Sequence, residues 1–373
     1  MKFFDEETKE FLLESLIKNS AVVNKYAPEA RLLEKAQDIV VADDNDPMVL
    51  HKERPYITTT QNQRYLTKAV PANAKKACVI LGAGDTLFQL LSQGVTDITA
   101  LDRNELQILM YYLRMASIKT LESNEFESFV LDINHDNFLS SEIFSKVIAG
   151  FEENQILERN FWKTFLEINP KEDLIKYYIK GGLEQSDLYR IRYCLPYLKK
   201  KSLYYGIREK IKNAKINIQF SDALEYLNEH DEEKFDYIDI TNILLLMFQL
   251  ECNSDQNEFA KVAERLRKIY DVNLKTGGTF VLDYMFGMDA KELFSKEEIK
   301  FEEKEFENGG KGSFENFLIY QENSINFQKY VYRSIYKVLN DYFDLETFQV
   351  EAGSQATALN NPMDTIILTK KAK

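Results

Sequence analysis

Residues 78–105 have the sequence CVILGAGDTLFQLLSQGVTDITALDRNE, in which apolar runs alternate with a glycine-rich turn and a helical pattern. The pattern predicts a strand at 77–81, a turn at 82–85, a helix at 86–93 ended by Gly94, and a strand at 97–101. Such a unit is typical of parallel α/β sheets, which bind nucleotides at the carboxyl ends of their strands.

The composition is that of a globular protein and narrows the range of partners. The chain has 373 residues, of which 45% are hydrophobic and 29% charged, and its net charge is −13. Phosphate binding needs clustered Lys and Arg, so we expect no nucleic-acid partner. We expect a cytoplasmic protein without a transmembrane segment, because there is no signal-peptide pattern and the longest apolar run is short. Peripheral contact with a membrane is left open.

The sequence around this unit divides into a core and two helical regions. Residues 1–70 are predicted to be a helical segment that closes over the site as a lid, and residues 122–212 a helical, aromatic-rich insertion on the substrate side. Alternating strands and helices resume afterwards and end in two strands that suit an antiparallel hairpin. We therefore predict an α/β core over residues 71–121 and 213–373, with a seven-stranded Rossmann-like sheet of the class I methyltransferase type.

The glycine turn favours one class of cofactor. Gly82 and Gly84 allow a cofactor to approach the backbone closely, because neither has a Cβ. A dinucleotide fingerprint needs a third glycine where this chain has Leu87, and Asp85 adds a charge that would repel a pyrophosphate. We therefore set aside a nicotinamide-dependent oxidoreductase and expect S-adenosylmethionine, which has no phosphate and carries cationic groups.

Acidic residues after the later strands fit this cofactor. Asp102 follows Gly82 by 20 residues and can accept hydrogen bonds from both ribose hydroxyls. Asp222 follows the third strand, where it can accept from the adenine amine, and Asp239 and Thr241 follow the fourth, beside the reacting sulfur. Each acid taken alone is also explained as a cap. The expected cofactor-binding residues are Gly82, Ala83, Gly84, Asp85, Thr86, Asp102, Arg103, Asp222, Ala223, Asp239 and Thr241.

The same part of the chain resembles a known enzyme family. The shared elements are an AGD turn (83–85), an LDxN segment (101–104), a long helix and an LxxxEF segment (121–126). Together they resemble the 3-amino-3-carboxypropyltransferase half of the betaine-lipid synthases and related bacterial proteins, over roughly residues 60–285. The resemblance implies an S-adenosylmethionine-dependent enzyme. In the best-known relatives the aminocarboxypropyl chain is transferred to the hydroxyl of diacylglycerol.

Two positions depart from the usual patterns. S-adenosylmethionine enzymes usually have an acid two residues before the first glycine, and this chain has Ile80 there. Members of the resembled family often have GDN where this chain has Gly84-Asp85-Thr86. We expect Asp85 to take over part of the missing acid's role, as a partner of the cofactor's ammonium group.

The expected reaction is in-line displacement at a sulfonium carbon. Presentation of the methyl carbon gives methyl transfer, and presentation of the methionine γ-carbon gives 3-amino-3-carboxypropyl transfer, to a small-molecule or lipid-like acceptor. Asp239 and His135 are candidate bases and Tyr284 a candidate orienting group, although His135 also suits an exposed loop and Tyr284 the core. The alternative is a non-catalytic binding protein of the same fold. No metal site is expected, since the cysteines and histidines are scattered.

Overall fold

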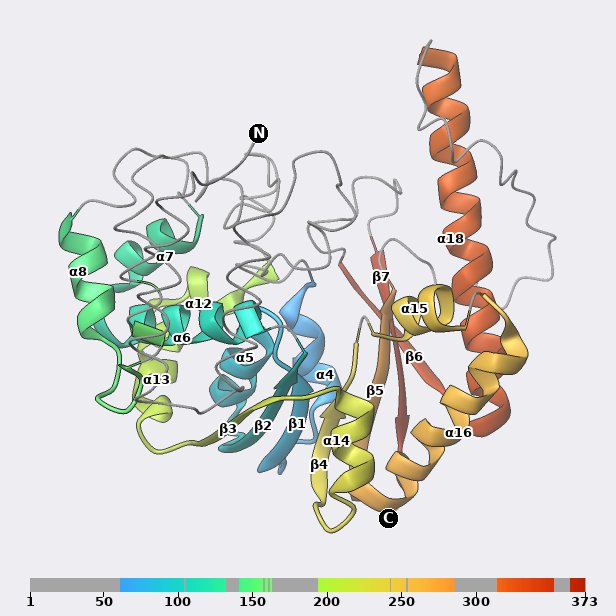
Figure 1. The fold of residues 1–373 in the computed structure, drawn as a ribbon, viewed down its shortest axis with the longest axis horizontal. Coiled ribbons are helices and arrows are strands. Elements are labelled where there is room, and N and C mark those ends of the chain that lie inside the picture. The colour runs from blue at the N-terminus through green and yellow to red at the C-terminus, as the bar shows by residue number, and fades with distance from the viewer. Residues whose placement is uncertain are drawn as a thin grey trace, which may run out of the picture. The chain divides into compact units, whose positions relative to one another are not determined.

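The computed structural model describes residues 61–103, 105–131, 141–156, 158–159, 162, 194–241, 243–252, 254–285, 314–351 and 363–372 (Figure 1). His135 and nearly all of the predicted N-terminal helical segment lie outside the described residues. The predicted insertion at 122–212 is described in part.

Seven described strands form one mixed sheet (Figure 1). They are β1 (Lys76–Ile80), β2 (Asp97–Asp102), β3 (Lys215–Phe220), β4 (Phe235–Asp239), β5 (Leu274–Met285), β6 (Glu346–Glu351) and β7 (Met363–Lys370). Their order across the sheet is β3-β2-β1-β4-β5-β7-β6. The pairs β1–β4, β2–β3 and β4–β5 are parallel, whereas β7 is antiparallel to both β5 and β6. The prediction of an α/β protein whose parallel sheet ends in an antiparallel hairpin is confirmed.

Helices fill most of the connections between these strands. They are η1 (Gln63–Tyr65), α4 (Leu66–Ala69), α5 (Asp85–Gln93), α6 (Glu105–Thr120), α7 (Ser123–Leu131), α8 (Ser141–Ala149), α12 (Pro196–Lys199), α13 (Lys201–Ile211), α14 (Ala223–Glu229), α15 (Ile243–Leu246), η2 (Met247–Glu251), α16 (Gln256–Asn273) and α18 (Phe314–Tyr342). The predicted strand, turn, helix and strand at 77–101 correspond to β1, α5 and β2, with boundaries that differ by one residue.

The chain forms two compact units, which are described separately. Among the described residues, the first unit comprises Ile80–Asp222 and the second comprises Thr60–Val79 and Ala223–Lys373. The first therefore holds α5 to β3, and the second holds β1, β4 to β7 and the later helices. The domain boundaries expected from the sequence remain a prediction.

The first unit is built around α5, β2 and β3. The interior residues of β2 are all buried, and α6 packs on β2 and β3. The fully buried hydrophobic residues of α5 are Leu87, Phe88, Leu90 and Leu91. Gly94 ends this helix with φ of 96°, and its N–H donates to the carbonyls of Leu90 and Leu91. The sequence places a glycine here because an L-residue rarely adopts this conformation.

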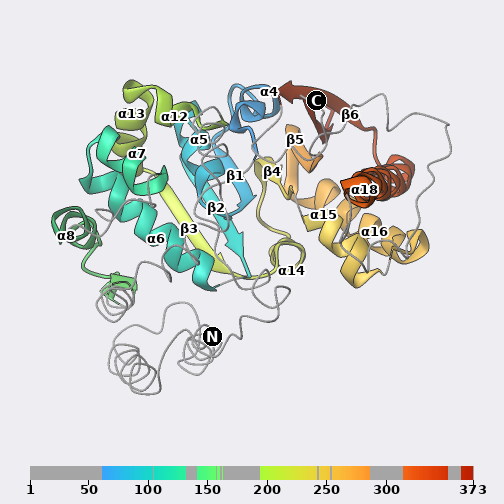
Figure 2. The same ribbon diagram turned by 90° about the horizontal axis from the view of Figure 1, so that it is seen from above.

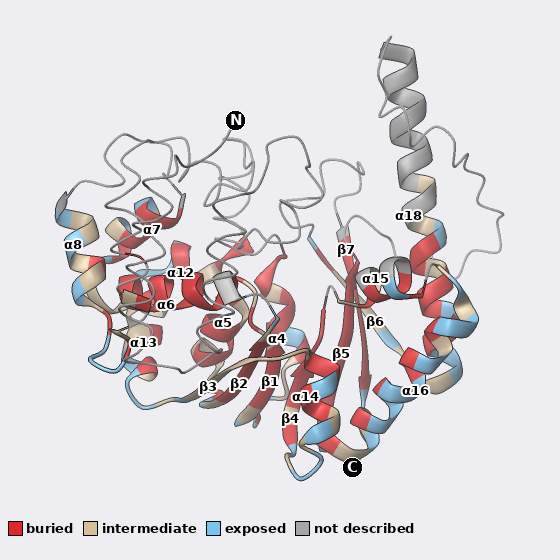
Figure 3. Ribbon diagram, viewed as in Figure 1, coloured by how far each residue is buried: buried red, intermediate tan, exposed pale blue. Residues whose placement is uncertain are grey.

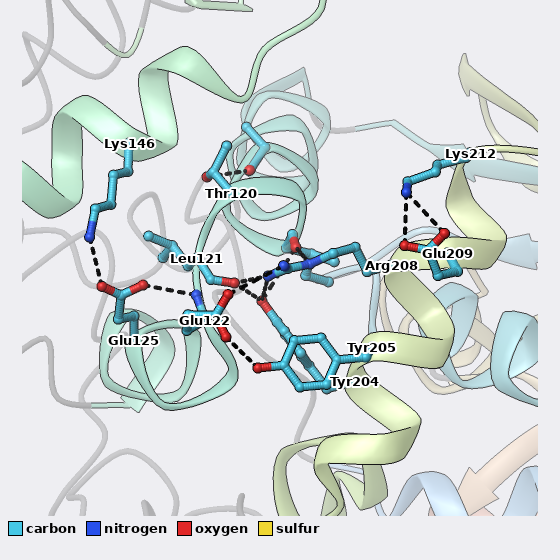
Figure 4. A network of polar contacts seen from close by, with 12 residues as sticks. Thr120, Leu121, Glu122, Glu125, Lys146, Tyr204, Tyr205, Arg208, Glu209 and Lys212 are labelled. Atoms are coloured by element: carbon cyan, nitrogen blue, oxygen red, sulfur yellow. Dashed lines mark hydrogen bonds and ion pairs between the residues drawn. The ribbon is translucent and has the colours of Figure 1, made fainter.

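Helix α13 holds the C-terminal end of α6 in the same unit (Figure 4). Arg208 donates from Nε to the carbonyl of Ile118 at 2.7 Å and from Nη2 to the carbonyl of Leu121. The hydroxyl of Tyr204 donates to the same Leu121 carbonyl at 2.8 Å. These donors satisfy carbonyls that the end of a helix leaves without an intrahelical partner.

A glycine allows α8 to pack against α6. A Cβ at Gly150 would collide with the backbone carbonyl of Ala116. The end of α8 therefore approaches α6 more closely than any other residue would allow.

The second unit has two long helices, of which α16 packs on β5 and α18 packs on α16. α16 and α18 lie side by side in Figures 1 and 2 and contact one another. Val331, Ile335 and Leu339 of α18, spaced four residues apart, are fully buried and form one helical stripe. Figure 3 shows buried residues along β4 and the later part of β5, and exposed residues on the outer side of α16.

Candidate functional site

The glycine turn of the first unit connects the end of β1 to α5. The N–H of Leu81 donates to the carbonyl of Leu101 at 2.8 Å, so the turn is hydrogen-bonded to the end of β2. The N–H of Gly84 donates back to the Leu81 carbonyl at 2.8 Å and closes the turn. Gly82 and Gly84 have φ of 46° and 83°, in the left-handed region that favours glycine.

The two glycines serve different purposes. A Cβ at Gly82 would meet no heavy atom within 4 Å, so this glycine faces open space. A Cβ at Gly84 would lie 2.9 Å from the ring of Tyr111, so this glycine is needed for packing. The N–H of Gly82 donates to Oδ2 of Asp102 at 3.2 Å. The structure thus brings together the predicted turn and the predicted ribose-binding carboxylate.

The end of β3 lies beside the end of β2. Asp102 is paired with Phe220, and the N–H of Ser221 donates to the Asp102 carbonyl at 3.1 Å. Asp102 and Asp222 are both half-buried, whereas Arg103 is exposed. The predicted adenine-binding residue therefore follows the strand adjacent to the one that carries Asp102.

Two further predicted residues lie at helix starts. Thr86 is half-buried in the first turn of α5, and Ala223 is buried at the start of α14, in the second unit. The cofactor-binding roles expected of Thr86 and Ala223 remain predictions.

Asp85 has a different partner from the one predicted. Its carboxylate accepts hydrogen bonds from Nη2 of Arg114 at 2.6 Å and from the hydroxyl of Tyr197. Nη2 of Arg114 also donates to the Tyr197 oxygen at 2.8 Å, and Nη1 donates to the carbonyl of Ala83. The side chains of Arg114 and Asp85 have no solvent exposure. We call Arg114, Asp85 and Tyr197 the Arg114 cluster.

Burial and charge act in opposite directions on this cluster. Burial alone lowers the pKa of the Arg114 guanidinium, but the Asp85 charge and the hydrogen bonds of Asp85 and Tyr197 raise that pKa above its usual value. Burial also raises the pKa of the Tyr197 phenol. The guanidinium is therefore charged and the phenol neutral, and both bind the carboxylate of Asp85.

This pairing corrects two inferences from the sequence. A carboxylate that is buried against a guanidinium is not available as the partner of a cofactor's ammonium group, the role expected of Asp85. Its charge is also no longer an argument against a pyrophosphate. Leu87, which stands where a dinucleotide fingerprint has glycine, is fully buried in α5. That a nicotinamide cofactor is disfavoured remains a prediction.

The second unit contains a cluster around Asp239. Oδ2 of Asp239 accepts from the hydroxyls of Tyr65 and Tyr237, each at 2.6 Å, and Oδ1 accepts from the N–H of Thr241 at 3.1 Å. Nε2 of Gln61 donates to the Thr241 hydroxyl at 3.0 Å. The segment before β1 is therefore attached to the end of β4.

Burial raises the pKa of the Asp239 carboxyl, although its three donors act in the opposite direction. Burial and the Asp239 charge raise the pKa of both phenols, Tyr65 and Tyr237. If Asp239 acted as a base, it would take up a proton at a carboxylate that is bonded to two buried phenols. Its role as a base remains a prediction, and the geometry gives it an evident structural role.

Tyr284 lies near the end of β5 and connects three segments. Its hydroxyl donates to Oδ2 of Asp364 at 2.6 Å and accepts from the N–H of Asn62 at 2.9 Å. Its ring meets that of Tyr65 edge to face, with 5.5 Å between the ring centroids. The alternative interpretation of Tyr284 as a core residue fits these contacts, and its orienting role in a reaction remains a prediction.

Sequence reasoning missed the residues that contact the predicted acids. Arg114 gave a signal, because it is the one charged side chain in the helical stretch 108–118 and lies among apolar neighbours. Such a residue needs a buried partner. Tyr65 and Tyr197 gave none, since tyrosines are common throughout this chain.

The described residues contain neither a metal site nor a membrane span. Among them, no three His, Cys, Asp or Glu side chains gather as a set that could hold a metal ion. No helix in the described part of the chain is long and apolar enough to cross a bilayer.

Comparison with known proteins gave little similarity. No family model matches this sequence, and no curated protein matches it. The chain is similar in backbone to the crystal structure of a possible exported protein from Bordetella parapertussis, with 10% sequence identity and a TM-score of 0.33. The similarity covers 98% of this chain and 96% of that one. A similarity of this size assigns neither a fold family nor an activity.

Proposed function

We propose that the protein is an S-adenosylmethionine-dependent transferase, which moves a 3-amino-3-carboxypropyl or methyl group to a nucleophilic acceptor. One observation carries the proposal: the N–H of Gly82, in a left-handed turn that faces open space, donates to the half-buried carboxylate of Asp102. An adenosyl group needs this combination, a backbone without a Cβ beside an acceptor for its ribose hydroxyls.

The topology supports the same proposal. The parallel strands are followed by an antiparallel β7 that lies between β5 and β6. A sheet of this kind supports the class I methyltransferase-type fold predicted from the sequence. In parallel α/β sheets, ligands bind outside the carboxyl ends of the strands, where the turn and Asp102 lie.

The described residues of the first unit fit the cofactor. A carboxylate has two oxygens and about four lone-pair sites, so the hydroxyls of a ribose are partners of the kind that Asp102 accepts, as it accepts the N–H of Gly82. Asp222, at the next strand end, would meet the adenine amine. The structure does not assign Asp85 to the ammonium group, which other residues must meet. When bound, S-adenosylmethionine supplies an electrophilic carbon next to its sulfonium.

The transferred group and the acceptor are the less specific part of the proposal. The resemblance to the betaine-lipid synthases favours the aminocarboxypropyl group and a hydroxyl of a lipid-like or small-molecule acceptor. The chain's own contribution to the rate would be to hold the acceptor and the cofactor in line.

A second candidate is a non-catalytic protein of the same fold that binds S-adenosylmethionine and a partner. It is favoured by the contacts of the two described catalytic candidates. Asp239 accepts three hydrogen bonds within the chain, and the Tyr284 hydroxyl both donates and accepts within it. Groups held in this way suit a rigid frame as well as they suit catalysis.

Calorimetric titration with S-adenosylmethionine and S-adenosylhomocysteine tests cofactor binding. Asp102→Asn should weaken binding by about 10- to 150-fold, since a hydrogen bond to a charged group contributes about 1.5–3 kcal/mol. The control is Asp97→Asn, at the other end of β2, where the carboxylate forms a partly exposed pair with Lys215. This control should bind as the wild type does.

The glycines provide a second matched pair of variants. Gly82→Ala and Gly94→Ala both place a Cβ in open space on a left-handed backbone, so both should cost about 1–2 kcal/mol of stability. Only Gly82→Ala should weaken cofactor binding. Wild-type protein that binds neither ligand would contradict the proposal.

Product analysis separates the two transfer reactions. Methylthioadenosine identifies aminocarboxypropyl transfer, and S-adenosylhomocysteine identifies methyl transfer. Binding without either product, over a panel of amines and hydroxyl compounds, would favour the non-catalytic candidate.

A further inference from the structure

The Arg114 cluster connects three segments of the first unit that lie far apart in the sequence. Ala83 and Asp85 belong to the turn and the start of α5, Arg114 to α6, and Tyr197 to α12. Tyr197 lies 112 residues from Asp85 and within the predicted insertion. The glycine turn between β1 and α5 is thus held by side chains from two other helices, α6 and α12.

The turn needs such a support. Ala83 lies between Gly82 and Gly84, both with positive φ, and two glycines give the free chain wide conformational freedom. Arg114 binds the carbonyl between them and, through the same guanidinium, the Asp85 carboxylate at the start of α5. These contacts fix the direction of the Ala83 peptide group and the start of the helix together.

The cluster is poorly explained as a source of stability. A fully buried ion pair is often no more stable than an apolar replacement of similar volume. Nε of Arg114 is buried and has no hydrogen-bond partner among the described residues, which costs free energy. The guanidinium lies 5.5 Å from the ring centroid of Phe88 and 6.0 Å from that of Phe126, so apolar packing surrounds it already.

We propose that Arg114 and Tyr197 are positioning residues that hold the glycine turn in the shape that binds the adenosyl group. The proposal rests on the proposed function and extends it, because Tyr197 connects α12, a described part of the predicted insertion, to the glycine turn. Neither residue touches the cofactor. Both act through Ala83 and Asp85.

The chain offers a matched pair of tyrosines for the test. Tyr197→Phe removes one hydroxyl from the cluster and keeps the ring, which packs against Phe88 and Phe126. Tyr204→Phe, in the adjacent α13, removes a buried hydroxyl that bonds to the carbonyls of Ile118 and Leu121 at the C-terminal end of α6. These carbonyls are not part of the turn. The two variants should lose similar stability in urea unfolding.

Cofactor affinity should separate the two variants. We expect Tyr197→Phe to raise the Kd for S-adenosylhomocysteine about tenfold, as the loss of one such bond implies, and Tyr204→Phe to leave it unchanged. Arg114→Lys, which keeps the charge but not the fork of donors, should raise the Kd further. Equal Kd values for wild type and Tyr197→Phe, or an equal loss in Tyr204→Phe, would overturn the proposal.

Amide hydrogen exchange gives a readout that is independent of the ligand. The N–H groups of residues 82–87 should exchange faster in Tyr197→Phe than in Tyr204→Phe. If the wild type binds no adenosyl ligand, the proposed function fails, and the exchange comparison still decides whether the cluster holds the turn. Unchanged exchange in Tyr197→Phe would overturn the positioning role.

Discussion

Two buried aspartates illustrate how the same side chain is compensated in different ways. Asp85 faces the cation of Arg114, whereas Asp239 faces the neutral phenols of Tyr65 and Tyr237. Hydrogen bonds from the phenols only partly offset the free-energy cost of burying a charged carboxylate, so the pKa of Asp239 is raised. At Asp85, the charge of the guanidinium compensates the carboxylate directly.

The raised pKa of Asp239 predicts how stability depends on pH. Between its unfolded and folded pKa, the folded chain keeps a proton that the unfolded chain releases. The contribution of Asp239 to the free energy of unfolding therefore falls as pH rises through this window, by about 1.4 kcal/mol for each unit of pKa difference. Urea unfolding of the wild type and of Asp239→Asn, from about pH 4 to about pH 7, measures this contribution to the free energy of unfolding.

The difference between the two proteins isolates this residue. The asparagine amide does not titrate, so its effect on the free energy of unfolding is the same at every pH. The free energy of unfolding of the wild type minus that of Asp239→Asn should therefore decline as pH rises. Asp97→Asn, which removes a carboxylate from a partly exposed pair, should show a much smaller trend. A stability difference that stays constant over the whole range would show that Asp239 keeps an ordinary pKa.

At the scale of the elements, the ends of helices depend on neighbouring helices. The C-terminal end of α6 is held by donors from α13 (Figure 4). The same helix carries Arg114, so α6 is bonded to α13 at its C-terminal end and to the glycine turn through Arg114.

Arg208→Ala should lower the free energy of unfolding by about 1.5–3 kcal/mol, because it removes charged donors from two helix-end carbonyls. Lys212→Ala is a control at the end of the same helix, since Lys212 pairs with Glu209 where both side chains are mostly exposed. Its effect should stay within about 0.5 kcal/mol. Chemical unfolding of both variants makes the comparison, and equal losses would refute the role assigned to Arg208.

At the scale of the whole molecule, local sequence patterns predicted the main elements well. The run CVIL, the glycines at 82 and 84, and Gly94 define β1, the turn and α5 through strand propensity and backbone conformation, which act over a few residues. The strand patterns near the C-terminus likewise predicted the antiparallel pair β6 and β7. These features depend on neighbours along the chain.

The contacts of the candidate site could not be predicted in this way. Asp85 meets Arg114 across 29 residues and Tyr197 across 112, and Asp239 meets Tyr65 across 174. The sequence shows that an acid follows a strand, but its partner depends on tertiary packing. The partner of Asp85 lies within the chain and not in a ligand, whereas the hydrogen bond from Gly82 to Asp102 brings two of the predicted cofactor-binding residues together.

The assignment of the cofactor is decided by a crystal structure of the wild-type protein with S-adenosylhomocysteine. We expect the adenosyl group to lie against Gly82, with both ribose hydroxyls about 2.5–3.2 Å from the carboxylate oxygens of Asp102. A nucleoside bound elsewhere, or an Asp102 carboxylate turned away from the ribose, would contradict the proposed function.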